Sequence, residues 1–451
     1  MVTGDLPQAA LGRAGPTGRL RVRWVMLLIM FALSVMAYVQ RTGIGVAADR
    51  MMPELGLTTV DLGWLQTAFL VSYTAFQIPG GIVGELIGAR RCLFFMGLLA
   101  VAASFATALL PALMTGAALM AGLLATRFVL GISHGPIFPV TAGVNEAWFP
   151  AKQWSFAMGF LSSGLNVGSA VAQPLVATVM AASNWQTALI VSSAPMLLVV
   201  AIWGWYGRDR ATEHWAVSAE ELDELCRDPE SHGRPIVTLR QTLRLLANRE
   251  ILLLSLSYLL MNYVFYLLTF WVFLYLVQER HFSVLESGFL AALPYLAAAA
   301  GAGFGGHWSD LLRNRYGAAW GYRLLPLAAL PITGLALILT VEASGAFWAI
   351  FGLCLAFFAV ETTEGPYWAA TTEVAQTDTT IATGVLNTGG NLGGVIFTPL
   401  VGWLAENGDW GAAFMTGAAC SLVAAALWLL VDARRKFIST VADDDIAQVM
   451  A

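Results

Sequence analysis

Long apolar stretches, separated by short polar segments, recur along the whole chain. A helix needs about 20 mostly apolar residues to cross the hydrocarbon core of a bilayer. Twelve stretches meet this requirement, near residues 24–47, 61–84, 91–113, 117–141, 154–181, 186–206, 250–277, 286–311, 322–342, 346–369, 378–404 and 410–432. The pattern therefore predicts an all-α membrane protein with twelve transmembrane helices.

The longest polar segment, 207–249, separates six predicted spans from the other six. It carries charges of both signs, and we interpret it as a solvated linker without a partner, with a short amphipathic helix near 218–227. The predicted organisation is a cytoplasmic tail (1–23), an N-terminal six-helix bundle (24–206), a cytoplasmic linker (207–249), a C-terminal six-helix bundle (250–433) and a second cytoplasmic tail (434–451).

An internal repeat supports this division into halves. The segment 159–168 (GFLSSGLNVG) resembles the segment 384–393 (GVLNTGGNLG) at an offset of 225 residues, and Pro174 matches Pro399 at the same offset. Two similar six-helix halves related by an axis along the membrane normal are a known plan for transporters.

Composition agrees with a lipid environment and excludes several kinds of protein. The chain is 58% hydrophobic and 12% charged, whereas a soluble domain has about 25% charged residues. The net charge of -5 gives no basic surplus for nucleic acid. The four cysteines are scattered, and we find neither a metal-ligand spacing nor a nucleophile–base pair. We therefore predict no cofactor, no metal and no enzymatic activity.

The distribution of positive charge predicts the orientation, because cytoplasmic segments of inner-membrane proteins are enriched in Lys and Arg. With the N-terminus in the cytoplasm, all but four of the 24 Lys and Arg residues fall in cytoplasmic segments. Arg50 and Arg280 lie in external loops, and Arg41 and Arg127 lie within spans. We expect a multi-pass protein of the cell inner membrane with both termini cytoplasmic.

The segment between the second and third spans resembles the signature loop of the major facilitator superfamily. Residues 81–91 (GIVGELIGARR) fit its Gly-x-x-x-[Asp/Glu]-x-x-Gly-x-[Arg/Lys]-[Arg/Lys] pattern, with Glu85 in place of the usual Asp. The resemblance extends over about residues 24–435. It implies two bundles around a central cavity, which rocking of the halves exposes to each side of the membrane in turn.

Three segments resemble, more narrowly, the anion:cation symporter family, which includes the galactonate, glucarate and hexuronate carriers. They are 38–41 (YVQR) in the first span, 69–81 (FLVSYTAFQIPGG) in the second, and 127–139 (RFVLGISHGPIFP) in the fourth. Gln40 and His134 depart from this pattern, because galactonate-type members have proton-carrying Asp and Glu residues there. Proton coupling through these two carboxylates therefore does not carry over to this chain, and sodium coupling, exchange and uniport stay open.

Arg41 is the main candidate for substrate binding. It lies deep in the first span, where an unpaired charge costs roughly 2.5–3.5 kcal/mol on insertion scales. We expect its guanidinium to bind a substrate carboxylate at two points. The alternative is a permanent ion pair with Glu361 or Glu364. Arg127, in the fourth span, is predicted to contact substrate or to hold an outer gate, or else to make structural hydrogen bonds.

His134 is the first candidate for proton coupling, because an imidazole exchanges protons near physiological pH. It lies seven residues after Arg127, on the same helix face. This neighbouring cation disfavours the imidazolium and an arriving anion favours it, so anion and proton would bind together. The alternative is a neutral imidazole bonded to the hydroxyl of Ser133, Ser162 or Ser163.

Glu364 is the second candidate for proton coupling. In the sequence Thr-Glu-Gly-Pro it occupies the position that His134 has in Ser-His-Gly-Pro, at an offset of 230 residues. A carboxylate in a span is costly unless it is paired or protonated. Glu364 is therefore a proton site or the partner of an arginine, and the same holds for Glu361.

Two further groups of residues complete the prediction. By the resemblance, seven amide and aromatic side chains are expected to line the cavity, and the alternative is that they only pack helices together. They are Tyr38, Tyr73, Gln77, Asn166, Trp368, Asn387 and Asn391. Charged residues of the signature loops are expected to form a cytoplasmic gate: Glu85, Arg90, Arg91, Asp310 and Arg313.

Together these features predict a monomeric secondary transporter that takes up a small organic anion, a carboxylate such as a sugar acid, by proton symport. The alternative on the same fold is an efflux pump or exchanger for metabolites or drugs. The two arginines within spans argue against cationic drugs.

Overall fold

The computed structural model describes residues 21–226, 244–245, 247–376 and 379–437. The predicted tails and the second part of the linker lie largely outside the described residues. The helices in chain order are α1 (Val22–Leu55), α2 (Thr59–Ala75), α3 (Gln77–Ile87), α4 (Ala89–Leu109), η2 (Leu110–Ala112), α5 (Gly116–His134), α6 (Ile137–Trp148), α7 (Ala151–Ala182), α8 (Trp185–Ser193), α9 (Pro195–Tyr206), η3 (Ala211–Glu213), α10 (Ala219–Cys226), α12 (Arg249–Gln278), α13 (Val284–Glu342), α14 (Ala346–Thr362), α15 (Glu364–Ala375), α16 (Thr379–Glu406) and α17 (Trp410–Trp428).

The twelve predicted spans correspond to these helices, and the described residues contain no strand. Nine helices in this part of the chain are long and apolar enough to cross a membrane by length and composition. One of them, α13, contains two predicted spans on either side of Gly317, whose φ of 72° breaks the helix. The two remaining spans are α2–α3, which is interrupted at Phe76, and the glycine-rich α16.

Prolines explain why four spans consist of two helices each. The breaks between α2 and α3, α5 and α6, α8 and α9, and α14 and α15 lie at or shortly before Pro79, Pro136, Pro195 and Pro366. Proline has no backbone N–H to donate, so it interrupts the ladder of helical hydrogen bonds, although Gly135 and Ala194 before two of these prolines keep helical φ and ψ. The breaks free the backbone near the middle of the membrane, where candidate site residues lie.

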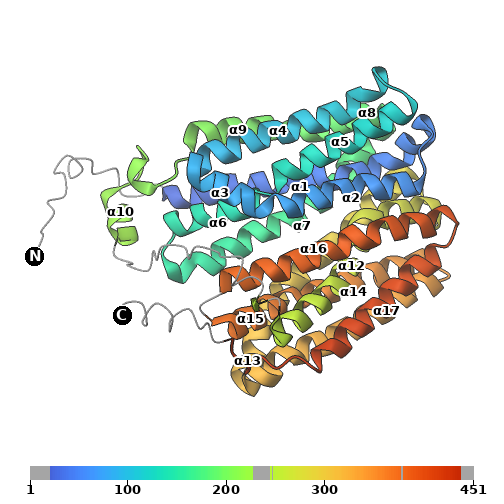
Figure 1. Cartoon of the computed structure of the whole chain (residues 1–451). Helices are drawn as coiled ribbons and strands as arrows, with labels where there is room; N and C mark the ends of the chain where they lie inside the picture. The colour runs from blue at the N-terminus through green and yellow to red at the C-terminus, as the bar shows by residue number, and fades with distance from the viewer. Residues whose placement is uncertain (1–20, 227–243, 246, 377–378, 438–451) are drawn as a thin grey trace, which may run out of the picture.

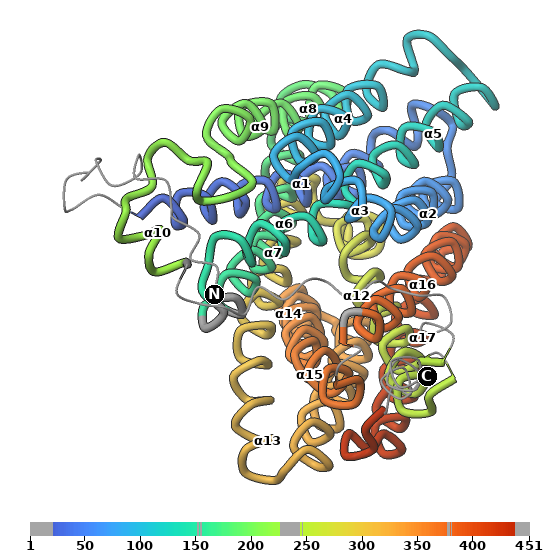
Figure 2. Tube along the Cα trace, turned by 60° about the vertical axis from the view of Figure 1, so that its left-hand side comes forward, coloured from blue at the N-terminus to red at the C-terminus, as the bar shows by residue number. Residues whose placement is uncertain are grey.

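Helices α1–α9 form one bundle and α12–α17 form the other (Figure 1). The turned view shows the two groups on opposite sides of a shared boundary (Figure 2). Across this boundary α1 packs on α12, α2 on α16 and α7 on α13. The architecture is the predicted all-α fold of two six-helix bundles.

The bundles meet closely along one end of this boundary, which we call the outer contact: Gly45, Thr59, Val60, Gly63, Gly288, Phe270, Pro399, Gly402 and Glu406. The Thr59 hydroxyl donates to the Gly402 carbonyl at 2.9 Å, and the Val60 N–H donates to Glu406 at 3.2 Å. Gly45 faces the Phe270 carbonyl, and Gly63 faces Pro399. Glycines here let backbones approach each other. In the predicted orientation the outer contact lies on the external side.

Glycines toward the other end of the same helices have open space beside them. An added Cβ would meet no atom within 4 Å at Gly159 of α7, Gly306 of α13 or Gly384 of α16. In the predicted orientation these positions face the cytoplasmic side. The described state is therefore closed at the outer contact, and these three glycines do not take part in close packing.

The first part of the linker is docked on the N-terminal bundle. The predicted amphipathic helix is α10, and its Glu221 carboxylate accepts hydrogen bonds from the backbone N–H groups of Val22 and Arg23, each at 3.1 Å. The Arg23 guanidinium, which is fully buried, lies 2.5 Å from Glu224. Residues 207–226 thus pack on the bundle, and the interpretation of this part of the linker as a solvated segment is wrong.

Aromatic packing completes this docking. His214 is buried among the rings of Trp148, Tyr206 and Trp215, with centroid distances of 5.6, 4.6 and 5.5 Å. Burial lowers the pKa of the His214 imidazole, so the ring is neutral at pH 7. The contacts could not be read from composition because the segment is as charged as an ordinary solvated linker.

We expect Glu221→Gln to release the linker from the bundle. Breaking a buried charge pair costs about 3 kcal/mol, which raises the population of the undocked linker roughly 100-fold. Limited proteolysis within residues 207–226 should accelerate accordingly. The control is Glu220→Gln, because Glu220 is exposed on the same helix. Equal proteolysis rates for the two variants would contradict a stabilising role for the buried pair.

Candidate substrate site

Arg41 lies in the middle of α1, and its side chain is 2% exposed. Nη1 donates to the Tyr38 hydroxyl at 2.9 Å, and Nη2 donates to the Tyr266 hydroxyl of α12 at 3.2 Å. The guanidinium lies 4.9–5.8 Å from the centroids of five rings: Tyr38, Phe69, Tyr73, Tyr266 and Phe270. Arg41 thus occupies an aromatic box that both bundles build.

No carboxylate of the described residues forms an ion pair with Arg41. The alternative of a permanent pair with Glu361 or Glu364 is therefore not formed in this state. Cation–π contacts contribute about 2 kcal/mol when desolvated, and they do not cancel the charge. Nε also has no hydrogen-bond partner. A buried guanidinium whose charge is not neutralised and whose Nε–H has no partner can bind an anion.

Arg127 approaches the same box from α5. Its Nη2 donates to the Gln66 side chain at 2.8 Å and to the Arg41 carbonyl at 3.5 Å. The Phe69 ring lies between the two arginines, 5.1 Å from the Arg127 guanidinium carbon. In this state Arg127 makes the structural hydrogen bonds of the alternative interpretation, and its substrate or gating role stays a prediction.

His134 and Gln40, the two departures from the family pattern, contact each other. The His134 Nε2 lies 3.3 Å from the Gln40 amide oxygen, and the imidazole edge meets the Phe69 ring at 5.7 Å between centroids. The hydroxyls of Ser133 and Ser163 donate to backbone carbonyls of their own helices instead. A neutral His134 in this state therefore has Gln40 as its partner.

A small pocket brings together four of the predicted site residues. Its lining comes from α1, α2, α5, α6 and α7: Ser34, Ala37, Tyr38, Arg41, Tyr73, His134, Ile137, Phe138 and Leu165. The pocket has room for about one water molecule. A small organic anion fits only if the surrounding helices move apart, as alternating access requires.

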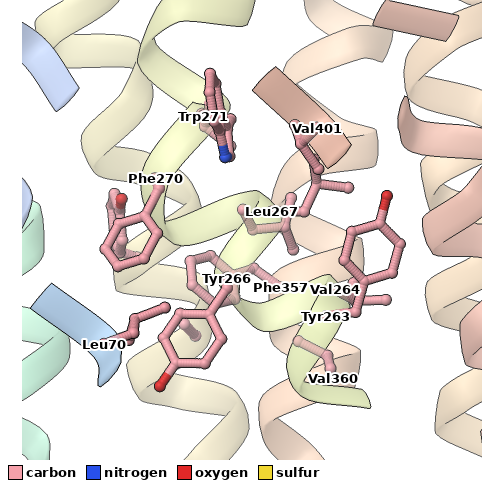
Figure 3. Packing of buried hydrophobic residues seen from close by; sticks show 14 of the residues in the cluster. Leu70, Tyr263, Val264, Tyr266, Leu267, Phe270, Trp271, Phe357, Val360 and Val401 are labelled. Carbon is pink, nitrogen blue, oxygen red and sulfur yellow. The ribbon is translucent and has the colours of Figure 1, made fainter. Parts of the chain in front are cut away.

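Polar side chains of the C-terminal bundle surround the boundary opposite this pocket. The Tyr266 hydroxyl donates to the Asn391 amide oxygen at 2.6 Å, so Arg41 and Asn391 are linked through one tyrosine. Figure 3 shows Tyr266 beside Leu70 of α2, at the boundary between the bundles. The Tyr258 hydroxyl and the Trp368 indole N–H both donate to the same Glu364 oxygen, each at 2.7 Å.

Besides the Arg41–Tyr266 hydrogen bond, a contact between two amide side chains joins the bundles. The Asn387 amide donates to the Gln77 amide oxygen at 2.7 Å. Asn166 of α7 and Glu361 of α14 lie near each other across the boundary. The structure thus places every predicted cavity residue at the boundary or in the pocket beside it, whereas their contacts with a substrate stay predictions.

The sequence profile of the Major Facilitator Superfamily matches residues 30–380. The chain belongs to the Major Facilitator Superfamily. It is similar to the probable sulfoacetate transporter SauU of Cupriavidus necator, with 30% identity over 427 residues that cover 92% of this chain and 95% of the relative. It is also similar to the probable galactarate/D-glucarate transporter GarP of Escherichia coli, with 27% identity over 425 residues that cover 91% and 94%.

Among solved structures, the bacterial homolog of the human lysosomal transporter Spinster has the same fold. The TM-score is 0.72 at 19% identity, and the alignment covers 93% of this chain and 98% of that chain. The predicted superfamily and the resemblance to sugar-acid transporters are confirmed by these comparisons. This facilitator is therefore a multi-pass membrane transporter and not an enzyme.

The signature-loop residues of this facilitator bond within their own bundles where their contacts are described. The Arg90 guanidinium donates to the Gly204 carbonyl, and its backbone N–H donates to Asp209 at 2.6 Å. Arg313 pairs with Glu373 at 3.3 Å. The side chains of Glu85, Arg91 and Asp310 are exposed. A gate formed by these five residues stays a prediction for the state with the cytoplasmic side closed.

Sequence reasoning missed Phe69, Tyr258 and Tyr266. Phe69 separates the two buried arginines, and the tyrosines bind Arg41 and Glu364. The only signal was the spacing of Tyr258 and Tyr266, eight residues and about two helical turns apart in one apolar span. Such a pair is indistinguishable from ordinary packing until the partner helix is known.

Proposed function

We propose that this facilitator takes up a small organic anion across the inner membrane by proton symport. One observation supports the anion in particular: Arg41 is buried between the bundles and no carboxylate of the described residues neutralises it. The names of the similar proteins support the same substrate class, because sulfoacetate, galactarate and glucarate are all small organic anions. Carboxylates and sulfonates both present oxygens that a guanidinium binds at two points.

In the proposed bound state, the anion replaces the Tyr266 hydroxyl as the hydrogen-bond partner of Arg41 Nη2. It also accepts a hydrogen bond from the Arg41 Nε–H, which has no partner in the described state. Tyr266 keeps Asn391 as its partner, so this exchange leaves no buried hydroxyl without a hydrogen bond. The remaining hydroxyl or carboxyl groups of the anion lie toward the amides of Gln77 and Asn387. Opening of the outer contact then admits the next anion from the external side.

His134 gives this site a route to proton coupling. Its imidazole shares the pocket with Arg41 and lies on the helix that carries Arg127. Two positive charges therefore disfavour a third positive charge on the imidazole. An anion bound at Arg41 removes that opposition. The proton therefore binds together with the anion, as symport requires, and Glu364 is the second candidate carrier.

The proposal is tested with proteoliposomes loaded at neutral pH and diluted into acidic buffer. We expect accumulation of sulfoacetate or galactarate that a protonophore abolishes. His134→Gln should lose accumulation and keep exchange of internal for external anion, because the variant still binds anion and no longer carries the proton. Gln40→Asn is the matched control, because it alters the hydrogen-bond partner of the imidazole and leaves the imidazole itself in place.

Three results would contradict the proposal. Wild-type uptake that does not depend on the pH gradient would exclude proton symport. Unchanged, pH-dependent accumulation in His134→Gln would exclude His134 as carrier and leave Glu364. Transport of organic cations with no transport of anions would instead support the efflux alternative.

A further inference from the structure

Arg127 is a second buried cation beside Arg41, and it too lacks a counter-ion. Its side chain is 2% exposed, and no ion pair joins it to a carboxylate in the part of the chain that the structure describes. Its Nη2 donates to the Gln66 amide oxygen at 2.8 Å and to the Arg41 carbonyl at 3.5 Å. These acceptors are neutral, so they do not cancel its charge. The described state therefore buries two positive charges close together.

The Phe69 ring sets the spacing of these two charges. It is fully buried, and its centroid lies 5.0 Å from the Arg41 guanidinium carbon and 5.1 Å from the Arg127 guanidinium carbon. The separation of the two guanidinium carbons cannot exceed the sum of these distances. A molecule with an acidic group at each end of a short carbon skeleton can therefore reach both guanidiniums once the ring turns aside.

The amides beside the two arginines have donors without acceptors. The Gln40 oxygen faces His134 Nε2 at 3.3 Å, and the Gln66 oxygen is the acceptor for Arg127. The amide nitrogens of both glutamines are buried without a partner, and so is Nε of each arginine. A buried donor without an acceptor is costly. These groups therefore favour a ligand that is rich in acceptor oxygens.

The same pattern continues toward the C-terminal bundle. The amide oxygens of Gln77 and Asn391 accept hydrogen bonds from Asn387 and Tyr266, whereas the amide nitrogens of Gln77 and Asn391 are buried without a partner. Neutral donors of this kind suit the hydroxyl groups of a substrate. A second ionised group instead requires a positive charge, because a buried anion is costly unless it is paired. Arg127 supplies that charge.

From this geometry we infer that the site is built for a dianion, with one acidic group bound by Arg41 and the other by Arg127. Gln66 donates to the second acidic group beside Arg127, and hydroxyl groups of a larger substrate lie toward Gln77. The inference rests on the proposed function and narrows its substrate class to anions with two ionised groups on a short skeleton. Arg127 becomes a substrate-binding residue.

Charge balance separates dianions from monoanions at such a site. A dianion neutralises both guanidiniums, whereas a monoanion leaves one of them buried without a counter-ion. An unmatched charge of this kind lowers affinity about 100-fold. Gln40 and His134 add to the preference, because acidic side chains at these two positions would supply negative charges of their own.

The test measures binding to the full chain in lipid nanodiscs by titration calorimetry at about pH 7.5. Two pairs of probes are compared, sulfoacetate with sulfoacetamide and galactarate with galactonate. In each pair the second anion keeps the size of the first and lacks one ionised group. We expect the monoanion of each pair to bind about 100-fold more weakly. Sulfate, which carries two charges on one centre, should also bind weakly because it cannot reach both guanidiniums.

Three variants test the role of Arg127. Arg127→Gln should lower the affinity for the dianions about 100-fold and that for the monoanions far less, so the preference within each pair disappears. Arg127→Lys keeps the charge and should retain part of the preference. Arg50→Gln is the matched control, because it removes an exposed arginine of α1 outside the pocket, and it should keep the wild-type preference. The melting temperature of each ligand-free variant reports its folding.

The inference is overturned if the two members of each pair bind the wild type with similar affinity, or if a folded Arg127→Gln keeps the preference for dianions. Binding of sulfate as tight as that of sulfoacetate would overturn the two-ended arrangement. Binding of the monoanions alone would reject the dianion and retain the proposed function. Absence of binding by all four organic anions would reject the proposed function together with this inference.

Discussion

Replacing Arg41 with Gln is expected to lower anion binding and uptake about 100-fold. The physical reason is the loss of a buried charge-assisted contact, which is worth about 3 kcal/mol, and each 1.4 kcal/mol is roughly a factor of ten in affinity. Arg41→Lys keeps the charge but loses the two-point geometry, so we expect about a tenfold loss. Binding is measured by ligand-induced thermal stabilisation and uptake by initial rates in proteoliposomes.

The same substitution should not destabilise the empty protein. Arg41 is buried, and its charge is not neutralised by any carboxylate of the described residues, so removing that charge also removes a desolvation cost. We expect the apparent melting temperature of Arg41→Gln without ligand to equal or exceed that of the wild type. Arg50→Gln is the control, because Arg50 lies on the same helix and is exposed outside the pocket. A large drop in melting temperature, with uptake lost in proportion to the folded fraction, would assign Arg41 a structural role.

Replacing Gly402 with Ala is the second change with a large expected effect. An added Cβ would lie 2.5 Å from the Thr59 carbonyl oxygen in the outer contact. The neighbour is backbone, so the contact relaxes only if α2 and α16 move apart. Overpacking of this kind costs about 1–3 kcal/mol, which lowers the closed population roughly 5- to 150-fold. Uptake should fall accordingly, because a carrier that cannot close its outer side cannot deliver substrate to the cytoplasm.

Gly411→Ala is the matched control for Gly402→Ala. Gly411 lies in α17 of the same bundle, and a Cβ there would meet its nearest neighbours at ordinary contact distances of 3.5 and 3.6 Å. Both substitutions add one methyl group to a helix and improve its intrinsic propensity. Maleimide labelling of Thr59→Cys, in a chain whose four native cysteines are replaced by Ser, should be faster in the Gly402→Ala background than in the Gly411→Ala background. Normal uptake by Gly402→Ala would show that the outer contact need not close as tightly as described.

The spans were predictable because the bilayer imposes them. A hydrocarbon core of fixed thickness requires a minimum apolar length, and this requirement acts on each helix separately. Arg41 was recognisable for the same reason, since a charge in a span requires a counter-ion or a water-filled cavity wherever the neighbouring helices lie. The helix breaks were missed, although Pro136 and Pro366 are plain in the sequence. The length of an apolar segment, which was the criterion for a span, does not depend on whether the helix is continuous.

The partners of the candidate residues were not predictable from spacing. Tyr266 meets Arg41 although they lie 225 residues apart, and Gln40 meets His134 across 94 residues. Which side chains meet depends on the rotation and tilt of each helix about its axis. The packing of small residues at the boundary fixes both quantities. The docking of Glu221 on Arg23 was missed for the same reason.

The sequence by itself determined a twelve-helix transporter in two related halves, with a guanidinium deep in the first span, because hydrophobic length and buried charge are properties of single segments. Only the tertiary structure decided that this guanidinium lies in an aromatic box, that Gln40 and His134 are partners, and that Asn387 reaches Gln77 across the boundary. Those facts arise from contacts between helices distant in the chain, and such contacts are set by packing of the whole molecule.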